Sequence, residues 1–209
     1  MTARRVRAYV GLGANLGDPA ATLTHAVAIL TSLEGARLRG VSRLYATVPV
    51  GVADQPEFRN AVVALDVPAG PDPATGALGL LEAIKTIERD VGRRPGRRWG
   101  PRVLDLDLLV FGRARLDVER TAAARSLDSD HDAVKAAARL VVPHPSAADR
   151  LFVLAPLADL APALVPPGWH ETVETARRRR LAIEGPDAVR VVGGWDPGSR
   201  GWRVLPSSG

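Results

Sequence analysis

The chain has no cysteine among its 209 residues. This absence excludes a disulfide framework, a thiolate metal site and a cysteine nucleophile, and it leaves no sign of an oxidising compartment. Long apolar runs are also missing, since none approaches the roughly 18 residues that a membrane span requires. Residues 1–14 carry arginines but no long apolar stretch before a cleavage site, so they predict no export signal. We therefore expect a cytoplasmic protein that does not engage a membrane.

Aromatic residues and lysine are both scarce. Aromatic side chains make up 4% of the chain, and Lys85 and Lys135 are its two lysines. The other 26 of the 28 basic residues are arginines, and the formal net charge is +5. Guanidinium groups are planar forks that suit bidentate contacts with phosphate. The charge balance therefore leaves two classes of partner open, a nucleic acid or a polyanionic small molecule.

Apolar periodicity and turn residues divide the first half of the chain into six elements. They predict strands over Val6–Leu12, Arg37–Tyr45, Phe58–Val67 and Val103–Phe111, with helices that begin at Pro19 and Pro73 and are closed by Gly35 and Gly92. This β-α-β-β-α-β order is typical of the ferredoxin-like α+β sandwich, with a four-stranded antiparallel core sheet and two helices on one face.

The rest of the chain gives weaker signals. We expect an insertion after the fourth strand, over about residues 113–140, with a hairpin and a short helix near Ala133–Arg139. Ser146 is expected to cap a further helix that ends before Pro156. Residues 1–165 would then form the main domain, and residues 166–209 a loosely packed, partly disordered extension with one helix and one strand.

Two aspartates in the fourth predicted strand carry the strongest chemical signal. Asp105 and Asp107 are two residues apart, so both side chains leave the same face of a strand. Paired carboxylates repel one another unless a cation lies between them, and magnesium is usually bound by a few carboxylates together with substrate phosphates. The alternative is the solvated polar face of an edge strand.

An arginine-rich segment precedes this acidic pair. Residues 93–102 contain five arginines together with Trp99, two glycines and two prolines. A polyphosphate needs such a mixture of metal-binding carboxylates and guanidinium groups. The glycines and prolines favour a loop that closes over a ligand. The alternatives are a solvated face or a nucleic-acid patch.

The segment from Arg98 to Asp107, Arg-Trp-Gly-Pro-Arg-Val-Leu-Asp-Leu-Asp, resembles the signature of the 6-hydroxymethyl-7,8-dihydropterin pyrophosphokinase family. Further blocks agree in order: Val10–Asp18, Tyr45–Gly51, Asp54–Asn60, Val142–Pro145 and Arg150–Phe152. The resemblance spans roughly residues 6–162. It implies an enzyme of folate biosynthesis that transfers pyrophosphate from ATP to a pterin alcohol and releases AMP.

The resemblance also implies roles for individual residues. Asp105 and Asp107 would hold two magnesium ions, and Arg102 and Arg93 would be catalytic, with Arg94 able to exchange with Arg93. The implied ATP-binding residues are Lys85, Glu88, Arg98, Trp99, Arg102, Leu108, Arg139, His144 and Arg150. The implied pterin-binding residues are Thr47, Val48, Val50, Phe58, Asn60 and Phe152.

Strand geometry supports part of the pterin assignment, because Phe58 and Asn60 share a face of one predicted strand. We expect Phe58 and Phe152 to sandwich the heterocycle and Asn60 to read its edge. The alternative is that both phenylalanines lie in the core.

Two other functions remain open. A single-stranded RNA-binding module uses the same element order, although paired aspartates on its sheet would repel phosphates. A metal-dependent nucleotidyltransferase would use the same Asp-x-Asp pair and release pyrophosphate instead of AMP. We expect ATP and the pterin as small-molecule partners, no nucleic acid, and a monomer.

Overall fold

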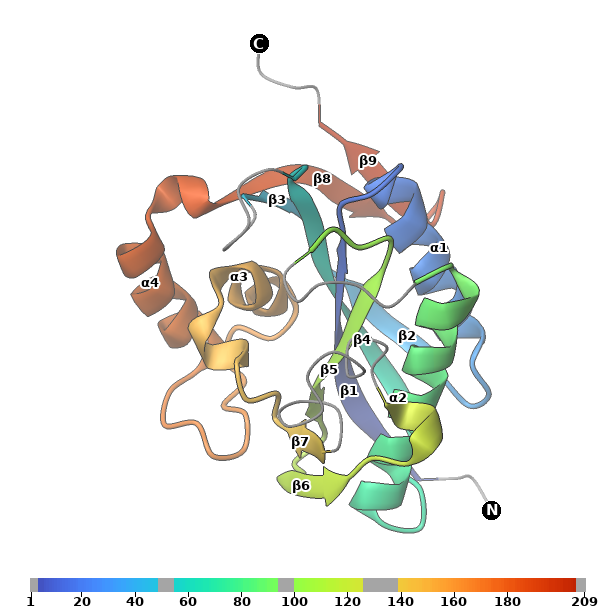
Figure 1. The fold of residues 1–209 in the computed structure, drawn as a ribbon. Coiled ribbons are helices and arrows are strands. Elements are labelled where there is room, and N and C mark those ends of the chain that lie inside the picture. Colours follow the sequence, from blue (N-terminus) through green and yellow to red (C-terminus); the bar gives the residue numbers. More distant parts are fainter. Residues whose placement is uncertain (1–3, 49–54, 94–99, 126–138, 206–209) are drawn as a thin grey trace.

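The computed structural model describes residues 4–48, 55–93, 100–125 and 139–205. Within these ranges the chain forms an α+β fold around an antiparallel sheet of seven strands (Figure 1). The strands of this sheet are β1 (Arg5–Ala14), β2 (Arg37–Val41), β3 (Leu44–Thr47), β4 (Phe58–Pro68), β5 (Asp105–Phe111), β8 (Val189–Asp196) and β9 (Gly201–Val204). Their order is β5-β1-β4-β3-β8-β9, and β2 also pairs with β4.

Helices cover both faces of the sheet (Figure 1). They are α1 (Pro19–Ser32), α2 (Pro73–Asp90), α3 (Leu151–Leu160) and α4 (Val173–Glu184), with short 3-10 turns at Ala122–Ala124, Ala147–Asp149 and Pro186–Ala188. A separate two-stranded sheet joins β6 (Leu116–Glu119) to β7 (Arg139–Val142). None of the helices in the described part of the chain is long and apolar enough to cross a membrane.

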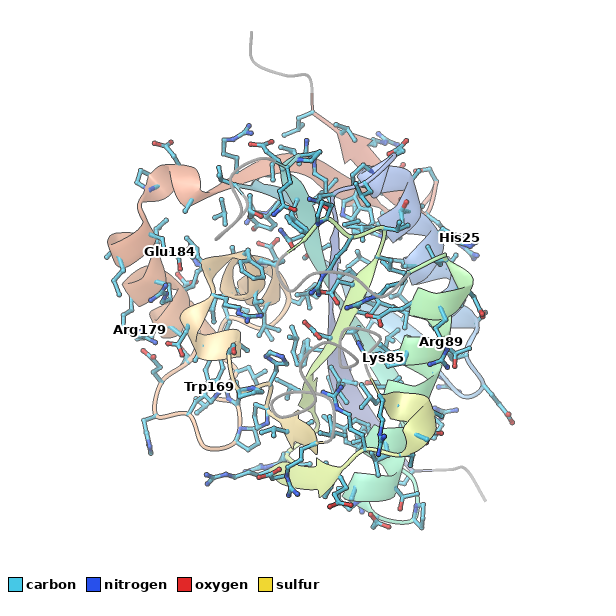
Figure 2. The ribbon with its side chains drawn as sticks, viewed as in Figure 1. His25, Lys85, Arg89, Trp169, Arg179 and Glu184 are labelled. Atoms are coloured by element: carbon cyan, nitrogen blue, oxygen red, sulfur yellow. The ribbon has the colours of Figure 1, made fainter. Side chains whose placement is uncertain are left out.

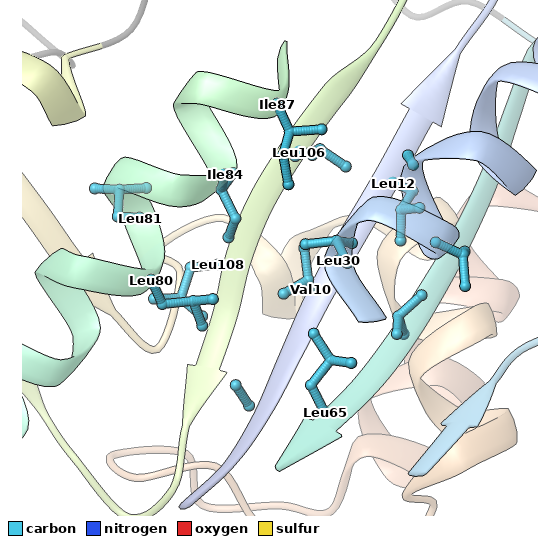
Figure 3. Packing of buried hydrophobic residues seen from close by; sticks show 14 of the residues in the cluster. Val10, Leu12, Leu30, Leu65, Leu80, Leu81, Ile84, Ile87, Leu106 and Leu108 are labelled. Atoms are coloured by element: carbon cyan, nitrogen blue, oxygen red, sulfur yellow. The ribbon is translucent and has the colours of Figure 1, made fainter. Parts of the chain in front are cut away.

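The strands divide their side chains between two apolar layers. Val10 of β1 and Val63 of β4 belong to the cluster that packs against α1 and α2, whereas their neighbours Tyr9 and Val62 belong to the cluster under α3 and α4. This alternation is the two-residue period of a strand. Figure 3 shows the first layer, where Leu80, Ile84 and Ile87 of α2 and Leu30 of α1 lie over the sheet.

The helix starts predicted from the sequence are confirmed. Asp18 and Asp72 are the N-caps of α1 and α2, and each carboxylate accepts a hydrogen bond from a backbone N–H three residues on. Proline follows at the first helical position in both cases. Gly35 adopts a φ of 72°, the left-handed conformation that closes the first helical segment.

The second predicted strand is wrong as a single element. It is divided into β2 and β3, because Ser42 and Arg43 leave the ladder. The Ser42 hydroxyl donates to the Arg43 carbonyl and accepts from the Val62 N–H, and the indole Nε1 of Trp202 donates to the Ser42 carbonyl. The break is therefore a hydrogen-bonded feature rather than a frayed end.

The predictions for the second half need further correction. Ser146 makes no side-chain cap, and α3 begins at Leu151 and continues through Pro156, because Leu154 and Leu157 are fully buried on the sheet. Two strands are expected in the insertion and occur as β6 and β7, and Arg139 lies in β7 rather than in a helix. The rest of that predicted helix lies outside the described residues.

The segment after residue 165 is not the loosely packed tail that the sequence predicts. It contains α4 and two strands instead of one, and β8 pairs with β3 of the main sheet. Its tryptophans Trp195 and Trp202 pack edge to face, with ring centroids 4.8 Å apart.

Candidate functional site

The acidic pair lies on the sheet face that α3 covers. Leu106 and Leu108 of β5 point into the core beneath α2. Asp105 and Asp107 alternate with them and therefore point to the opposite face. Both carboxylates are half-buried.

The pterin-site candidates of β4 share this face. Val62 and Ala64 pack under α3, so Asn60 and Phe58, which continue the same alternation, emerge on the same side. Asn60 is buried, and its Nδ2 donates to the Thr47 hydroxyl on β3 at 2.8 Å. Phe58 is partly exposed, so it is not a core residue.

Gly13 of β1 lies between the acidic pair of β5 and the pterin-site candidates of β4. It pairs with Asn60 on one side and with Asp105 on the other. A Cβ at this position would lie 3.2 Å from the Asn60 side-chain oxygen and 3.9 Å from the Asp105 Cβ. The missing side chain thus lets the Asn60 side chain and Asp105 lie close to the Gly13 backbone from either side.

Two arginines neutralise Asp105. Arg93 Nη1 lies 2.5 Å from Asp105 Oδ1, and Arg102 Nη1 lies 2.5 Å from Oδ2. Burial alone would raise the pKa of the Asp105 carboxyl, but the charges of Arg102 and Arg93 outweigh it and hold this pKa well below its usual range. Asp105 is therefore an anion with cations already in place around it.

The pair fits magnesium together with a phosphate ligand better than it fits a closed protein cage. Among the described residues, the Asp107 carboxylate makes no hydrogen bond or ion pair, and no cluster of three or more candidate metal ligands occurs. Magnesium is often bound by one or two carboxylates and completed by substrate phosphates and water. The carboxylates of Asp105 and Asp107 lie on one sheet face, and guanidinium groups already pair with Asp105. This arrangement agrees with such a site.

A buried ion pair holds the backbone between the two aspartates. The side chains of Lys85 and Glu88 on α2 are 6% and 1% exposed. Lys85 Nζ donates to the Leu106 carbonyl at 2.8 Å, and Glu88 Oε1 accepts from the Leu106 N–H at 2.6 Å. Arg93 Nη1 also donates to Glu88 Oε1 at 2.6 Å. Burial raises the pKa of Glu88, which Lys85 and Arg93 oppose.

The candidates from the second half of the chain approach the same face. The His144 N–H donates to the Leu109 carbonyl, and its Nδ1 accepts from the Ser146 N–H. Burial lowers the pKa of His144, and the charges of Arg150 and Arg120 lower it further, while Asp107 raises it. The Arg150 guanidinium lies 5.7 Å from the ring centre of Phe152, which is partly exposed at the start of α3.

Some predicted contacts have a different setting. The Leu108 side chain is 3% exposed and lies in the core under α2, so it does not reach the face of the acidic pair. Arg139 is exposed and pairs with Asp117 of β6 at 2.5 Å. Val48 is 62% exposed beside Thr47. Val50, Arg94, Arg98 and Trp99 lie outside the described residues.

Sequence reasoning missed two residues of the site. Asn15 is 2% exposed; its Oδ1 accepts from the Arg102 N–H at 2.7 Å, and its Nδ2 donates to the Pro56 carbonyl at 3.1 Å. Asn15 therefore joins the end of the arginine-rich segment to the residues that precede β4. Its place in the block Val10–Asp18 was the available signal.

Arg120, the residue directly after β6, is the second missed residue. Its Nε donates to the Arg139 carbonyl, and among the described residues it has no ion pair. Burial lowers the pKa of Arg120, and the charges of Asp107 and Glu88 raise it. It lies in the insertion, where no motif marks it.

This site combines an acidic pair, converging arginines and a histidine with a partly exposed aromatic and an amide on the same face. The combination is typical of α+β enzymes that bind a magnesium polyphosphate. The model of the 7,8-dihydro-6-hydroxymethylpterin-pyrophosphokinase (HPPK) family matches residues 9–162, and the chain belongs to this family.

Named relatives agree with this membership. The chain is 43% identical over 165 residues to a 2-amino-4-hydroxy-6-hydroxymethyldihydropteridine pyrophosphokinase of Pseudomonas aeruginosa, covering 78% of this chain and 86% of the relative. A protein of the same name from Methylorubrum extorquens is 42% identical over 186 residues, covering 89% and 98%.

Solved structures show the same fold. A crystal structure of Plasmodium falciparum HPPK-DHPS superposes with a TM-score of 0.72 at 15% identity. The match covers 97% of this chain and 51% of the other, so this chain spans about half the length of that protein.

Proposed function

We propose that this protein transfers the pyrophosphate group of ATP to the hydroxymethyl oxygen of 6-hydroxymethyl-7,8-dihydropterin and releases AMP, a step of folate biosynthesis. The observation that carries the proposal is the position of Gly13 on β1, which pairs with Asn60 of β4 on one side and with Asp105 of β5 on the other. Because Gly13 has no side chain, nothing of β1 projects between these two residues on that sheet face. An edge reader for a heterocycle and a carboxylate for a phosphate-bound metal are therefore neighbours. Family membership supports the same reaction.

The pterin half of the proposed site lies over β3 and β4 and beside α3. Phe58 and Phe152 would stack on the two faces of the ring, since an offset aromatic stack contributes about 0.5–1.5 kcal/mol beyond burial. The Asn60 amide offers a donor and an acceptor for the polar edge. Thr47, Val48 and Val50 would add backbone groups.

The phosphate half lies over β5. Asp105 and Asp107 would hold two magnesium ions, which when bound neutralise phosphate charge and orient the phosphates for attack. Arg93, Arg102, Arg98 and His144 would contact phosphate oxygens. The remaining proposed nucleotide contacts are Lys85, Glu88, Trp99, Leu108, Arg139 and Arg150.

Positioning and charge neutralisation would supply most of the rate enhancement. The hydroxymethyl oxygen forms a bond to the β-phosphorus, the bond from that phosphorus to the oxygen bridging to the α-phosphorus breaks, and AMP leaves with that oxygen. The hydroxyl proton is released to solvent, since a loose transition state needs little base catalysis. Arg102 and Arg93 would stabilise the charge on the transferred group.

We assign the core to the ferredoxin-like class. The elements β1, α1, β2 with β3, β4, α2 and β5 follow the β-α-β-β-α-β order, and the central order β5-β1-β4-β3 supports this assignment. We take residues 1–165 as the pyrophosphokinase unit, which contains the family match, and residues 166–209 as an extension. The monomeric state and the cytoplasmic location stay predictions.

The proposed reaction is tested with ATP, magnesium and the reduced pterin alcohol. We expect AMP to form only when the pterin is present, and chromatography of the nucleotides measures it. Pyrophosphate as the co-product would instead indicate a nucleotidyltransferase, which the Asp105 and Asp107 pair also allows. ADP as the co-product would contradict both.

A further inference from the structure

The family match ends at residue 162, and the chain continues for a further helix and two strands. We define residues 163–205 as the C-terminal segment. This segment packs along two elements of the proposed pterin site, β3, which carries Thr47, and α3, which carries Phe152. It also reaches Glu57, directly before β4.

The first contact completes a short strand. In the pairing of β3 with β8, Thr47 lies opposite Val189, Tyr45 opposite Val191 and Leu44 opposite Gly193. Without β8, the four residues of β3 would form an edge strand held on one side only. Pairing on both sides therefore fixes the strand beside Asn60.

The second contact lies at the start of β4. Arg190 of β8 pairs with Glu57 at 2.7 Å, and Glu57 directly precedes Phe58. Hydrogen bonding from Arg190 lowers the pKa of Glu57 despite partial burial. The pair is partly exposed, so its energy is small, but it ties the C-terminal segment to the backbone beside the proposed stacking ring.

The third contact supports α3. Val173 and Ala176 of α4 are fully buried against Leu154 and Leu157 of α3. Glu184 Oε1 accepts from the N–H of Leu151, the first residue of α3. This satisfies one of the free N–H groups at a helix start with a negative charge. Arg180 Nη2 pairs with Glu184 Oε1 at 2.6 Å and so holds this carboxylate in place. Glu184 is labelled in Figure 2, together with Arg179 of the same helix α4.

A direct clamp joins the two supported elements. Asp159 of α3 accepts hydrogen bonds from the Tyr45 hydroxyl at 2.9 Å and from the N–H and guanidinium of Arg43. The spacing between β3 and α3 is thus fixed by direct hydrogen bonds between them. It is also supported by β8, which pairs with β3, and by α4, which packs against α3.

We infer that the C-terminal segment is a positioning element for the proposed pterin site: it sets the spacing between Thr47 on β3 and Phe152 on α3 without contacting the ligand. This inference rests on the proposed function. A change in β8 should affect the phosphate half little, because β8 lies four strands from β5, about 19 Å at ~4.8 Å per strand. The α4 part of the segment is not used for this comparison, because Arg179 also contacts the Ala148 carbonyl between His144 and Arg150.

Two neighbouring glycines of β8 provide the test. A Cβ on Gly193 would lie 3.1 Å from the Arg203 carbonyl oxygen and 3.5 Å from the Leu44 Cβ, whereas a Cβ on Gly194 would meet nothing within 4 Å. The backbone of Arg203 on β9 cannot give way easily, and the two further methyl groups of valine need more room than the Cβ, so Gly193→Val should shift β8 relative to β9 and β3. Gly194→Val is the matched control. Calorimetric titration of the full chain measures the pterin Kd with magnesium and a non-hydrolysable ATP analogue present, and the Kd of the analogue alone.

We expect Gly193→Val to raise the pterin Kd at least about fivefold and the analogue Kd less than about twofold, because small misplacements of binding groups carry large penalties. Gly194→Val should match the wild type. Equal losses for both ligands, or an unchanged pterin Kd in folded Gly193→Val, would overturn the inference. A wild type that binds no pterin would instead overturn the proposed function.

A second pair of variants decides the question if Gly193→Val does not fold. Arg190→Glu should raise the pterin Kd about twofold, the scale of an exposed ion pair. The double variant Arg190→Glu with Glu57→Arg restores opposite charges between positions 57 and 190 but loses the pair of Glu57 with Arg59, so it should recover part of the loss. No loss in the single variant, or no recovery in the double variant, would overturn the inference.

Discussion

Arg93 and Asp105 share an ion pair of 2.5 Å, so a proposed catalytic residue and a proposed metal ligand neutralise one another. The same Arg93 nitrogen lies 2.6 Å from Glu88. Magnesium and ATP would compete for these partners, with the metal taking the carboxylate and a phosphate taking the guanidinium. The apo pairing therefore keeps both groups close to their proposed positions.

The two aspartates should differ in their effect on stability. Asp105→Asn and Asp107→Asn should each remove more than nine-tenths of magnesium-dependent turnover. Asp105→Asn should also lower the free energy of unfolding by about 1–3 kcal/mol, because Arg93 would lose a partner in a buried site. Asp107→Asn should leave it within about 0.5 kcal/mol, because that carboxylate has no ion pair among the described residues. Turnover and urea unfolding measure both effects, and activity above a tenth in both variants would remove the metal assignment.

The buried Lys85 and Glu88 pair should be needed for the local backbone. Lys85→Met leaves the Leu106 carbonyl without its donor and Glu88 with one cation fewer, so we expect a loss of about 2–4 kcal/mol in the free energy of unfolding. Lys85→Gln keeps a donor and should cost less. Urea unfolding compares the two variants. Equal losses would contradict the prediction, because they would show that a donor to the Leu106 carbonyl does not stabilise the fold.

Arg120 should contribute to phosphate binding. We predict that Arg120→Gln weakens binding of ATP more than of AMP, and AMP more than of adenosine, because a half-buried cation near Asp107 attracts phosphate charge. Arg113→Gln, at an exposed position of the same insertion, is the control. Calorimetry with the three ligands measures the effect. A uniform loss for all three would assign Arg120 to supporting the β6–β7 hairpin through the Arg139 carbonyl.

Replacing Phe152 or Asn60 should affect the binding of the pterin far more than that of ATP. Phe152→Ala and Asn60→Ala should weaken pterin binding far more than binding of a non-hydrolysable ATP analogue. Asn60 also donates to Thr47, so Thr47→Val is a useful comparison that removes this acceptor while keeping the backbone. Separate titrations with the two ligands test it, and equal losses for both would return Phe152 to a packing role.

The α4 helix should lose stability in acid. Hydrogen bonds from Arg177 and Arg178 lower the pKa of Glu174 to about 2, although burial opposes them. A carboxyl with a lowered folded-state pKa contributes stability above its unfolded pKa of about 4.3, and this contribution is lost as the pH falls towards about 2. Because the pair is solvent-screened, we expect about 0.5–1 kcal/mol. Urea unfolding at pH 5 and pH 2.5 should show a larger decrease for the wild type than for Glu174→Gln; an equal decrease would exclude this contribution.

The parts of the fold that the sequence predicted have strong local signals. Aspartate followed by proline marked both helix starts, and two-residue alternation placed Asp105 with Asp107 and Phe58 with Asn60. The failures depend on tertiary contacts. The break at Ser42 is held by Trp202, 160 residues away, and glycines that read as a loose tail in fact form β8 against β3. Strand order, which puts Gly13 between Asn60 and Asp105, has no local signal at all.

The most direct measurement follows the label from ATP that carries a radioactive phosphorus at the α or the β position. Attack at the β-phosphorus predicts that β-label moves to the pterin product with magnesium present, while α-label stays in AMP. The Asp107→Asn variant should show neither transfer. Movement of α-label to the pterin, or retention of β-label in ADP, would contradict pyrophosphate transfer.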